Sequence, residues 1–487
     1  MLSFMQAKNK KELPLLLALL PILLLMALLS YNVLVIYKDD ATSGANQFAL
    51  LLVGFIAALI GLRYKVTFND MLESVYKNIK TTSGAILILL FVGSLAGTWL
   101  ISGVIPTMIY YGLQVLNPTI FLAVAVVISA IISLATGSSW GTTATIGVAL
   151  IGIGRGLGID EGMIAGAVIS GAYFGDKISP MSDTTNLAAA MANIDLFKHI
   201  RYMLYTTGPS IGVALVLFII LGFFQEAHGE MQNLAILEGI QETFTISPWL
   251  MLVPVAVIVM IIKKVEPLVA LLIGTLLGGL AAFIAQPQVL QTIFGSDDSL
   301  NIHQSYEVIM NAIVGDTNIE TNNETLNSLF SSGGMKGMLS TIWLILSAMV
   351  FGGIMEAIGA LDSISKALLR MAKGDFGVFA STTATCIFFN GTVSDQYLAI
   401  VVPGKMYAKA FEEKGLAPEN LSRTLEDSGT VTSVLFPWNT GGAYNAGVLG
   451  VATGAYLPFA FFNLISPIMT LIFAGFKIRI RKNKNTN

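Results

Sequence analysis

Cysteine, histidine and charge are all scarce in this 487-residue chain. The single cysteine, Cys386, excludes an internal disulfide and a CxxC metal site. The three histidines, His199, His228 and His303, are scattered in predicted loops and form neither a cluster for zinc nor an HExxH motif. Charged residues make up only 12% of the chain, about half the share of a soluble domain. We therefore predict no enzymatic activity and no resident cofactor. The net charge of −3 says little about partners, and we expect no nucleic-acid partner.

Apolar residues are correspondingly abundant, at 54% of the chain with a mean hydropathy of +0.74. Many apolar runs are roughly 18 to 25 residues long, which is the length of a transmembrane helix. The first run, 13–37, is too long for a signal-peptide core and is predicted to stay in the mature protein. The composition predicts an all-α polytopic membrane protein embedded in a lipid bilayer.

The apolar runs differ in how they cross the membrane. We predict full crossings at about 13–37, 47–62, 84–101, 203–224, 248–262, 267–285, 338–358 and 456–476. Two further crossings, 162–194 and 425–455, are interrupted by polar residues and are predicted to be broken helices. Two pairs of runs joined by tight polar turns, 119–136 with 138–154 and 376–389 with 392–409, are predicted to be re-entrant hairpins.

The distribution of lysine and arginine predicts the orientation of these segments. With the N-terminus in the cytoplasm, only Lys38, Arg155 and Lys336 fall outside, and Lys177 falls in the membrane. The other lysines and arginines fall on the inner side, as the positive-inside rule requires. We therefore predict a multi-pass protein of the bacterial cytoplasmic (inner) membrane with both termini in the cytoplasm.

The chain also repeats itself. Each half contains, in the same order, a crossing, a surface helix, a hairpin and a crossing broken at a proline, Pro180 or Pro437. The first half enters from the cytoplasm and the second from outside, which is the inverted-topology repeat of secondary transporters. The predicted organisation is N-terminal helices in 1–83, repeats in 84–224 and 336–476, connecting helices and outer loops in 225–335, and a basic cytoplasmic tail in 477–487.

The first broken crossing concentrates polar chemistry. Pro180 lacks an N–H group and interrupts the helix, and Asp176, Lys177 and Asp183 surround it. Charges at membrane depth are expensive and mark functional sites. Hard oxygen ligands suit a small hard cation or a proton, so we predict that Na⁺ binds at Asp176 and Asp183. Neutral oxygens for the ion would come from Ser182, Thr184, Thr185 and Asn186.

The residues Ser170–Ala188 read SGAYFGDKISPMSDTTNLA. This segment resembles the signature of the NhaC-type Na⁺/H⁺ antiporters, a family that includes malate–lactate exchangers. The similarity extends over about residues 80–475. It implies a scaffold with a mobile transport domain, and usually a homodimer.

Other charges are predicted to lie at membrane depth as well. Asp395, Glu426 and Asp427 are further candidates for binding the ion or the proton. Glu426 and Asp427 are adjacent and repel each other, so one is expected to be protonated or paired with Lys177. We interpret Lys177 as a counter-ion that could also carry the exchanged proton. Glu356 is interpreted as a second counter-ion, or as neutralising a neighbouring helix.

The hairpin tips and the second break carry small polar residues. These are Gly137, Ser138, Ser139, Asn390, Gly391, Thr392, Pro437, Asn439 and Thr440. At a protein surface they would form ordinary turns, since glycine and asparagine favour positive φ. At membrane depth their hydroxyl, amide and N–H groups need partners, so we favour contact with the transported ligand.

Together these features predict a secondary active transporter that exchanges Na⁺ for H⁺ by alternating access. A Na⁺- or H⁺-coupled carrier of a small organic anion such as malate or lactate is the alternative. Helix N-termini at the breaks would suit a carboxylate, but no arginine is predicted at membrane depth to bind one. A passive channel is less compatible with an inverted repeat that carries acidic residues in the middle of the membrane.

Overall fold

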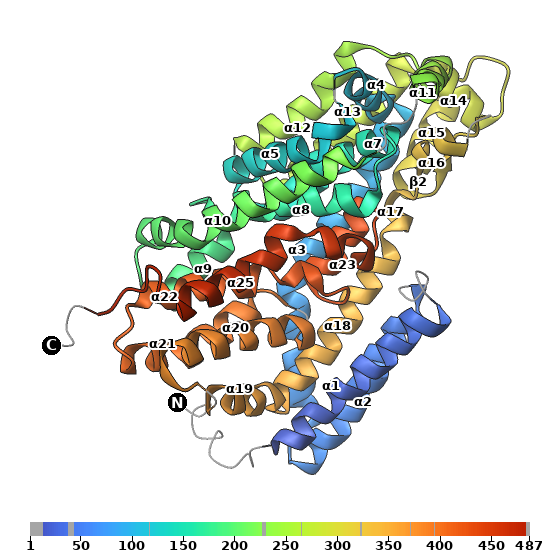
Figure 1. Ribbon diagram of the computed structural model, residues 1–487. Helices are drawn as coiled ribbons and strands as arrows, with labels where there is room; N and C mark the ends of the chain where they lie inside the picture. Colours follow the sequence, from blue (N-terminus) through green and yellow to red (C-terminus); the bar gives the residue numbers. More distant parts are fainter. Residues whose placement is uncertain are drawn as a thin grey trace.

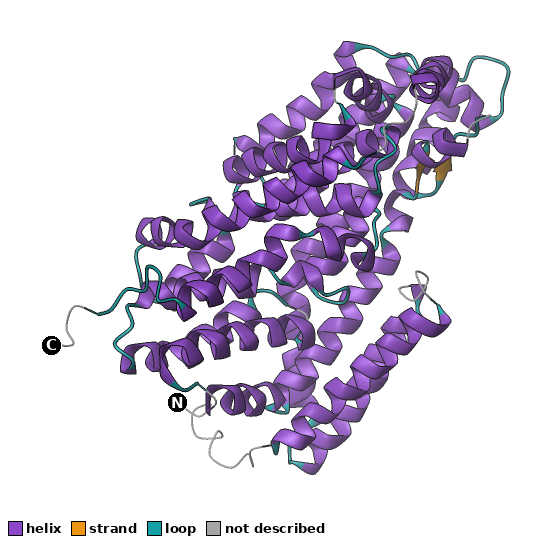
Figure 2. Ribbon diagram, in the orientation of Figure 1, coloured by secondary structure: helices purple, strands orange, loops and turns teal. Residues whose placement is uncertain are grey.

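The computed structural model describes residues 13–37, 43–115, 117–225, 230–263, 265–321, 324–370, 372–393 and 395–483. These residues form an elongated bundle that is almost entirely helical (Figures 1 and 2). One two-stranded antiparallel sheet joins β1 (Thr317–Asn318) to β2 (Ser331–Ser332). The prediction of an all-α membrane protein is confirmed, since six described helices are long and apolar enough to cross a bilayer, and two bent helix pairs pass the same test together.

The helices fall into four consecutive groups in the chain. The first comprises α1 (Leu15–Tyr31), α2 (Ala45–Arg63) and α3 (Phe68–Ile101). The second comprises α4 (Val104–Val115), α5 (Pro118–Thr136), α6 (Ser139–Thr142), α7 (Val148–Gly156), α8 (Glu161–Ile178), α9 (Asp183–Met191) and α10 (Leu196–Phe223). The third comprises α11 (Glu230–Thr243), α12 (Leu252–Ile262), α13 (Pro267–Ala285), α14 (Pro287–Phe294), α15 (Ile302–Val314), α16 (Glu324–Leu329) and α17 (Gly334–Gly337). The fourth comprises α18 (Leu339–Ala357), α19 (Ala360–Arg370), α20 (Gly374–Thr392), α21 (Leu398–Glu413), α22 (Pro418–Leu425), α23 (Thr440–Leu449), α24 (Thr453–Tyr456) and α25 (Phe461–Gly475).

The two hairpins point in opposite directions. The hairpin α5–α7 starts beside the end of α10, where Gly222 faces the carbonyl of Thr119. The hairpin α20–α21 starts beside the end of α25, where Phe376 faces Gly475. Because α10 and α25 run antiparallel, with Phe218 beside Phe461, their ends lie on opposite sides of the bundle. The predicted inverted repeat is therefore confirmed in the arrangement of the helices.

The opposite hairpins make an accessibility prediction. Single cysteines at Arg155 and Lys414, in a Cys386→Ala background, are expected to react with a membrane-impermeant maleimide from opposite sides of intact cells or vesicles. Cys386 is buried, so its removal takes away little background labelling. Labelling of both positions from one side would contradict the arrangement of the hairpins.

Two predicted boundaries were wrong. Helix α3 begins at Phe68 rather than near 84, because Thr67 and Asp70 form a capping box and the helix continues through its polar first turns. Asn390, Gly391 and Thr392 lie in the last turn of α20 rather than in a tight turn. The Thr392 hydroxyl donates to the carbonyl of Phe388 (2.7 Å), and the chain leaves the helix only at Val393.

The described part of the basic tail, 477–483, folds back under α22. Ala417 N–H donates to the Arg481 carbonyl at 3.0 Å, and Asn483 N–H donates to Gly415 at 2.8 Å. Burial of Glu419 raises its pKa, but the ion pairs with Lys198 (2.7 Å) and Arg481 (3.3 Å) outweigh burial and hold that pKa below its usual value. The tail is thus packed structure up to residue 483, while the rest of it and residues 1–12 lie outside the described residues.

Candidate functional site

The first broken helix is held together by side chains that bridge its gap. Helix α8 ends at Ile178 and α9 begins at Asp183, so Asp176 and Lys177 belong to the last turn of α8. Ser182 caps α9 by accepting from Thr185 N–H at 3.3 Å. The Thr185 hydroxyl donates to the Lys177 carbonyl at 3.0 Å. Asn186 donates to the carbonyls of Pro180 (3.1 Å) and Ser182 (2.7 Å). Thr185 and Asn186, predicted as ion ligands, are therefore engaged in the break itself.

The tip of the first hairpin is seated on this break. Gly137 has a φ of 70°, and a Cβ atom there would lie 2.6 Å from Cβ of Met181. Ser138 caps α6 by accepting from Gly141 N–H at 3.0 Å. The Ser139 hydroxyl donates to Asp176 Oδ2 at 2.7 Å. The tip and the break thus meet at Asp176.

Gly137 offers a direct test of that contact. Gly137→Ala is expected to push the tip off Met181 and to reduce transport strongly. The left-handed backbone adds a cost of about 1–2 kcal/mol for any residue with a Cβ. Gly359→Ala is the matched control, since Gly359 has a φ of 74° and nothing within 4 Å. Thermal stability and transport of the two variants should separate the backbone cost from the contact, and equal losses in both would show that the tip contact contributes nothing.

The second half contains a similar meeting of tip and break. Asn390 donates to the Gly429 carbonyl (2.6 Å) and to Thr432 (2.9 Å). Asn439 donates to the Asn390 carbonyl (2.8 Å) and caps α23 by accepting from Gly441 N–H (2.9 Å). Asn439 and Ser182 both cap the helix that follows a break, after Pro437 and Pro180 respectively. Both breaks therefore end in capped helix N-termini.

A cavity of about 480 Å³ lies where the first tip and break meet. The three aspartates in its lining come from separate elements: Asp176 from α8, Asp183 from α9 and Asp395 from the segment before α21. The first tip lines it as well, and so do Thr184 and Thr440. Of the predicted site residues, the cavity thus brings together these: Gly137, Ser138, Ser139, Asp176, Asp183, Thr184, Asp395 and Thr440.

The three aspartates have different surroundings. Asp176 is 5% exposed, and its Oδ1 atom has no hydrogen-bond partner among the described residues. Asp183 is exposed, and its Oδ2 accepts from the hydroxyl of Tyr397 at 2.9 Å. Asp395 is buried and accepts from Leu398 N–H at 2.9 Å. Asp176 is therefore the aspartate with a buried oxygen that has no hydrogen-bond partner among the described residues.

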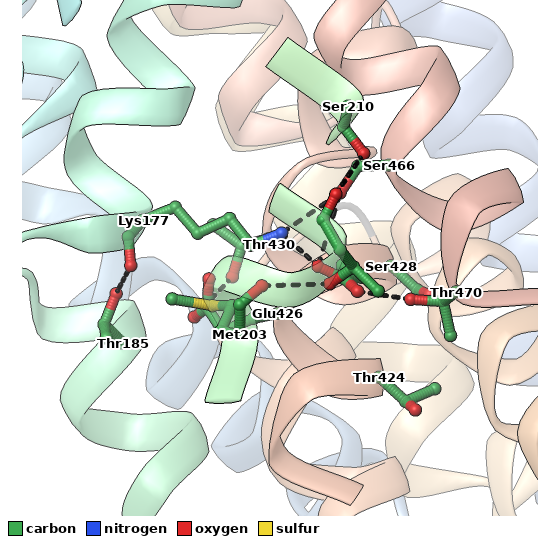
Figure 3. Close-up of polar contacts among 12 residues, drawn as sticks. Lys177, Thr185, Met203, Ser210, Thr424, Glu426, Ser428, Thr430, Ser466 and Thr470 are labelled. Carbon is green, nitrogen blue, oxygen red and sulfur yellow. Dashed lines mark hydrogen bonds and ion pairs between the residues drawn. The ribbon is translucent and has the colours of Figure 1, made fainter. Parts of the chain in front are cut away.

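Lys177 and Glu426 lie in a second polar cluster outside the lining of the cavity (Figure 3). Asp427 belongs to the same cluster. Lys177 forms a buried ion pair with Asp427 and donates to Ser466 at 3.0 Å. Asp427 also accepts from Thr470. Glu426 accepts from Thr430 at 2.9 Å. Since α8 and the segment after α22 belong to different halves, this cluster connects the two repeats.

Glu356 does not line the cavity and forms no hydrogen bond or ion pair with the described residues of the polar cluster around Lys177. It forms an ion pair with Lys77 of α3 at 3.5 Å and accepts from Ser74 at 3.4 Å. The structure thus places it beside a neighbouring helix, within electrostatic range of Asp395.

The sequence assigns Arg423 to the cytoplasmic side and does not predict its burial. Arg423 is fully buried in α22, and its guanidinium lies 4.7 Å from the Tyr202 ring. His199, predicted in a loop, is buried in the first turn of α10, and its Nδ1 lies 2.8 Å from Ser422. Four-residue spacing separates Glu419, Arg423 and Asp427 in the sequence. On a helix this spacing predicts that the three charged side chains share one face.

No group of three or more His, Cys, Asp or Glu side chains in the described ranges is arranged to hold a metal ion.

Comparison with known proteins places this architecture in a family. The model of the Na⁺/H⁺ antiporter family matches residues 171–478. The Na⁺/H⁺ antiporter NhaC of Alkalihalophilus pseudofirmus is 36% identical over 88% of this chain and 90% of its own length. The malate-2H⁺/Na⁺-lactate antiporter of Bacillus subtilis is 36% identical over 88% of both chains. The arginine/ornithine antiporter ArcD of Halobacterium salinarum is 32% identical over 95% of this chain and 93% of its own.

The family model covers both breaks and the second hairpin. The matches confirm the resemblance noted in the segment Ser170–Ala188. Since members of an antiporter family move solutes and catalyse no covalent reaction, the protein is a membrane transporter and not an enzyme. The chain belongs to the Na⁺/H⁺ antiporter family.

Proposed function

We propose that this protein exchanges Na⁺ for H⁺, with Asp176 and Asp183 as the carriers. The observation that carries the proposal is the carboxylate of Asp176, which is buried under the hairpin tip with one oxygen unpaired in an acidic cavity. A buried carboxylate must bind a proton or a cation to stay there. Binding one excludes the other, which is the requirement for exchange at a single site.

The other predicted ligand oxygens would contribute to ion binding in different ways. Ser139 already donates to Asp176, and its lone pairs and the Thr184 hydroxyl face the same cavity. Ser182, Thr185 and Asn186 hold the break in shape, so they would position the carriers and not coordinate the ion. Alternating access would move the two hairpin tips and the two breaks against helices such as α3 and α18.

The residues that line the cavity support an inference about the side of the membrane to which this conformation opens. Exposed Glu266 and half-buried Pro267, at the start of α13, line it together with Thr81 of α3. Both segments adjoin stretches rich in lysine that are predicted to be cytoplasmic. We infer an inward-open state in a cytoplasmic membrane, with both termini inside and a homodimer as the working assembly.

The organic-anion alternative rests on the malate–lactate relative. Against it, none of the described residues that line the cavity is Lys, Arg or His. Arg423 is buried but lies outside that lining. Na⁺ and H⁺ thus fit the charge of the cavity better than a dicarboxylate does.

Purified protein in vesicles that contain a pH-sensitive dye tests the proposal. A Na⁺ gradient alone should drive proton movement. The apparent KM for Na⁺ should rise as the pH falls, because protons occupy the same carboxylates, while the rate at saturating Na⁺ should change far less. An apparent KM independent of pH would reject a shared site. Proton movement that required added malate or lactate would favour the organic-anion carrier instead.

A further inference from the structure

The polar cluster around Lys177 continues along α22 to the surface of the protein. Every residue from Glu419 to Asp427 is buried. At one end of this segment Glu419 pairs with Lys198 and Arg481, whose side chains are about half exposed. At the other end Asp427 pairs with the fully buried Lys177. A row of buried charges therefore leads from the predicted cytoplasmic surface into the membrane, and none of these residues lines the cavity.

Several polar atoms along this row are buried without a hydrogen-bond partner among the described residues. They are Nε2 of His199, the three guanidinium nitrogens of Arg423, and one carboxylate oxygen each of Glu419 and Glu426. His199 belongs to the same row, because its Nδ1 lies 2.8 Å from the hydroxyl of Ser422 in α22. Buried polar groups that lack a protein partner usually bind ordered water. The row therefore has the donors and acceptors to hold a chain of water molecules.

Glu426 is the charge in this row that has no counter-ion. The other four charges alternate in sign and cancel, and they belong to Glu419, Arg423, Asp427 and Lys177. Glu426 forms no ion pair with a described residue, and its Oε1 accepts from the Thr430 hydroxyl at 2.9 Å. It also begins a π-helix, Glu426–Thr430, and such turns are frequent at functional sites. A buried carboxylate without a counter-ion has to bind a proton.

We propose that Glu426 binds a second proton, which reaches it from the cytoplasm along this row of charges and not through the cavity. The proton passes between water molecules and His199, whose two ring nitrogens can accept and release it on opposite sides. It is then held as an O–H group on the unpaired oxygen of Glu426. Na⁺ is excluded, because it would have to lose its water shell and pass the fixed positive charge of Arg423.

The inference rests on the proposed exchange at Asp176 and extends it. Glu426 lies within electrostatic range of Asp176, Lys177 and Asp427, and His199 lies within range of the last two. The charge on each of these groups therefore affects the others. One proton leaves the shared site when Na⁺ binds, and the second leaves Glu426 in the same cycle. Two protons thus move for each Na⁺, and the exchange transfers net charge.

The balance of opposing gradients measures the number of protons. In vesicles whose membrane potential is held at zero, a tenfold Na⁺ gradient should be balanced by a pH gradient of about half a unit for two protons per Na⁺ and of about one unit for one. Wild-type protein should give the first value and Glu426→Gln the second, with the calorimetric Na⁺ affinity unchanged. Glutamine keeps the shape of the side chain and can still accept from Thr430. Glu413→Gln, at an exposed acid, is the control and should give the wild-type value.

His199 variants test the path. His199→Leu should slow Na⁺-driven proton movement about tenfold or more, because it removes the group that passes the proton on. The loss should be largest at high pH, where protons are scarcest. His199→Gln keeps a side chain that can bind water and should recover part of the rate. Neither variant should change the Na⁺ affinity or the balancing pH gradient, because the path sets the rate and not the number of protons.

The outcomes separate this inference from the proposed function. A balancing pH gradient of about one unit in the wild type, or the same value in wild type and Glu426→Gln, would overturn the second proton and leave Na⁺/H⁺ exchange in place. A full rate in His199→Leu would overturn the path along α22. If Na⁺ drove no proton movement in the wild type, the proposed function would fail and the inference with it.

Discussion

Asp176→Asn is expected to lower Na⁺-driven proton movement by at least about 100-fold, equivalent to about 2.7 kcal/mol. Asparagine has nearly the same shape, and its carbonyl oxygen can still accept the hydrogen bond from Ser139. The substitution thus removes the negative charge and the titratable proton while the hairpin tip stays seated. Na⁺ would lose its principal carboxylate, and no exchangeable proton would remain at that position.

Isothermal calorimetry of Na⁺ binding from about pH 6 to 9 provides the measurement. The wild-type affinity should rise with pH and release protons to the buffer, since deprotonation precedes cation binding. Asp176→Asn should bind Na⁺ weakly and without that pH dependence. Asp183→Asn should lose less, about tenfold, because its carboxylate is exposed and partly solvated.

Glu413→Gln, which neutralises an exposed acid paired with Lys409, is the control for loss of a carboxylate outside the lining of the cavity. Unchanged exchange by Asp176→Asn, in protein of normal stability, would show that the carriers lie elsewhere. Glu426 would then be the next candidate, because one of its carboxylate oxygens is also buried without a partner among the described residues.

Lys177→Met is expected to destabilise the protein by about 3–5 kcal/mol, because it leaves Asp427 buried without its counter-ion. Both side chains are fully buried, so water cannot compensate for the lost partner. The Ser466 and Thr470 hydroxyls would remain, but they do not neutralise a carboxylate. The loss should appear as a lower midpoint of thermal unfolding in detergent.

The double variant Lys177→Met with Asp427→Asn should recover most of that stability, since it removes both charges together. Failure of the second substitution to rescue the first would mean that the ion pair is not the main contribution of Lys177. The double variant should also still bind Na⁺, because neither residue lines the cavity. A stable double variant that had lost Na⁺ binding would instead assign Lys177 a direct part in transport.

The sequence by itself determined the membrane class, the two halves and the positions of the breaks. These features are local: apolar runs of sufficient length form helices in a bilayer, and Pro180 and Pro437 each lack the N–H group that a continuing helix would use. The charges around Pro180 could be recognised as functional for the same reason, because their cost at membrane depth does not depend on which residues surround them.

Only the tertiary structure decided which polar groups meet. Lys177 is adjacent to Asp176 in the chain, yet it pairs with Asp427, 250 residues away, because successive residues of α8 point to different sides of the helix. Asn186 bridges the break, whereas Thr184, two residues earlier, lines the cavity. Arg423 lies in a segment assigned to the cytoplasmic side but is buried, since α22 packs against α10 and α25. Such pairings depend on how helices from the two halves dock, and hydropathy and spacing along one chain do not contain that information.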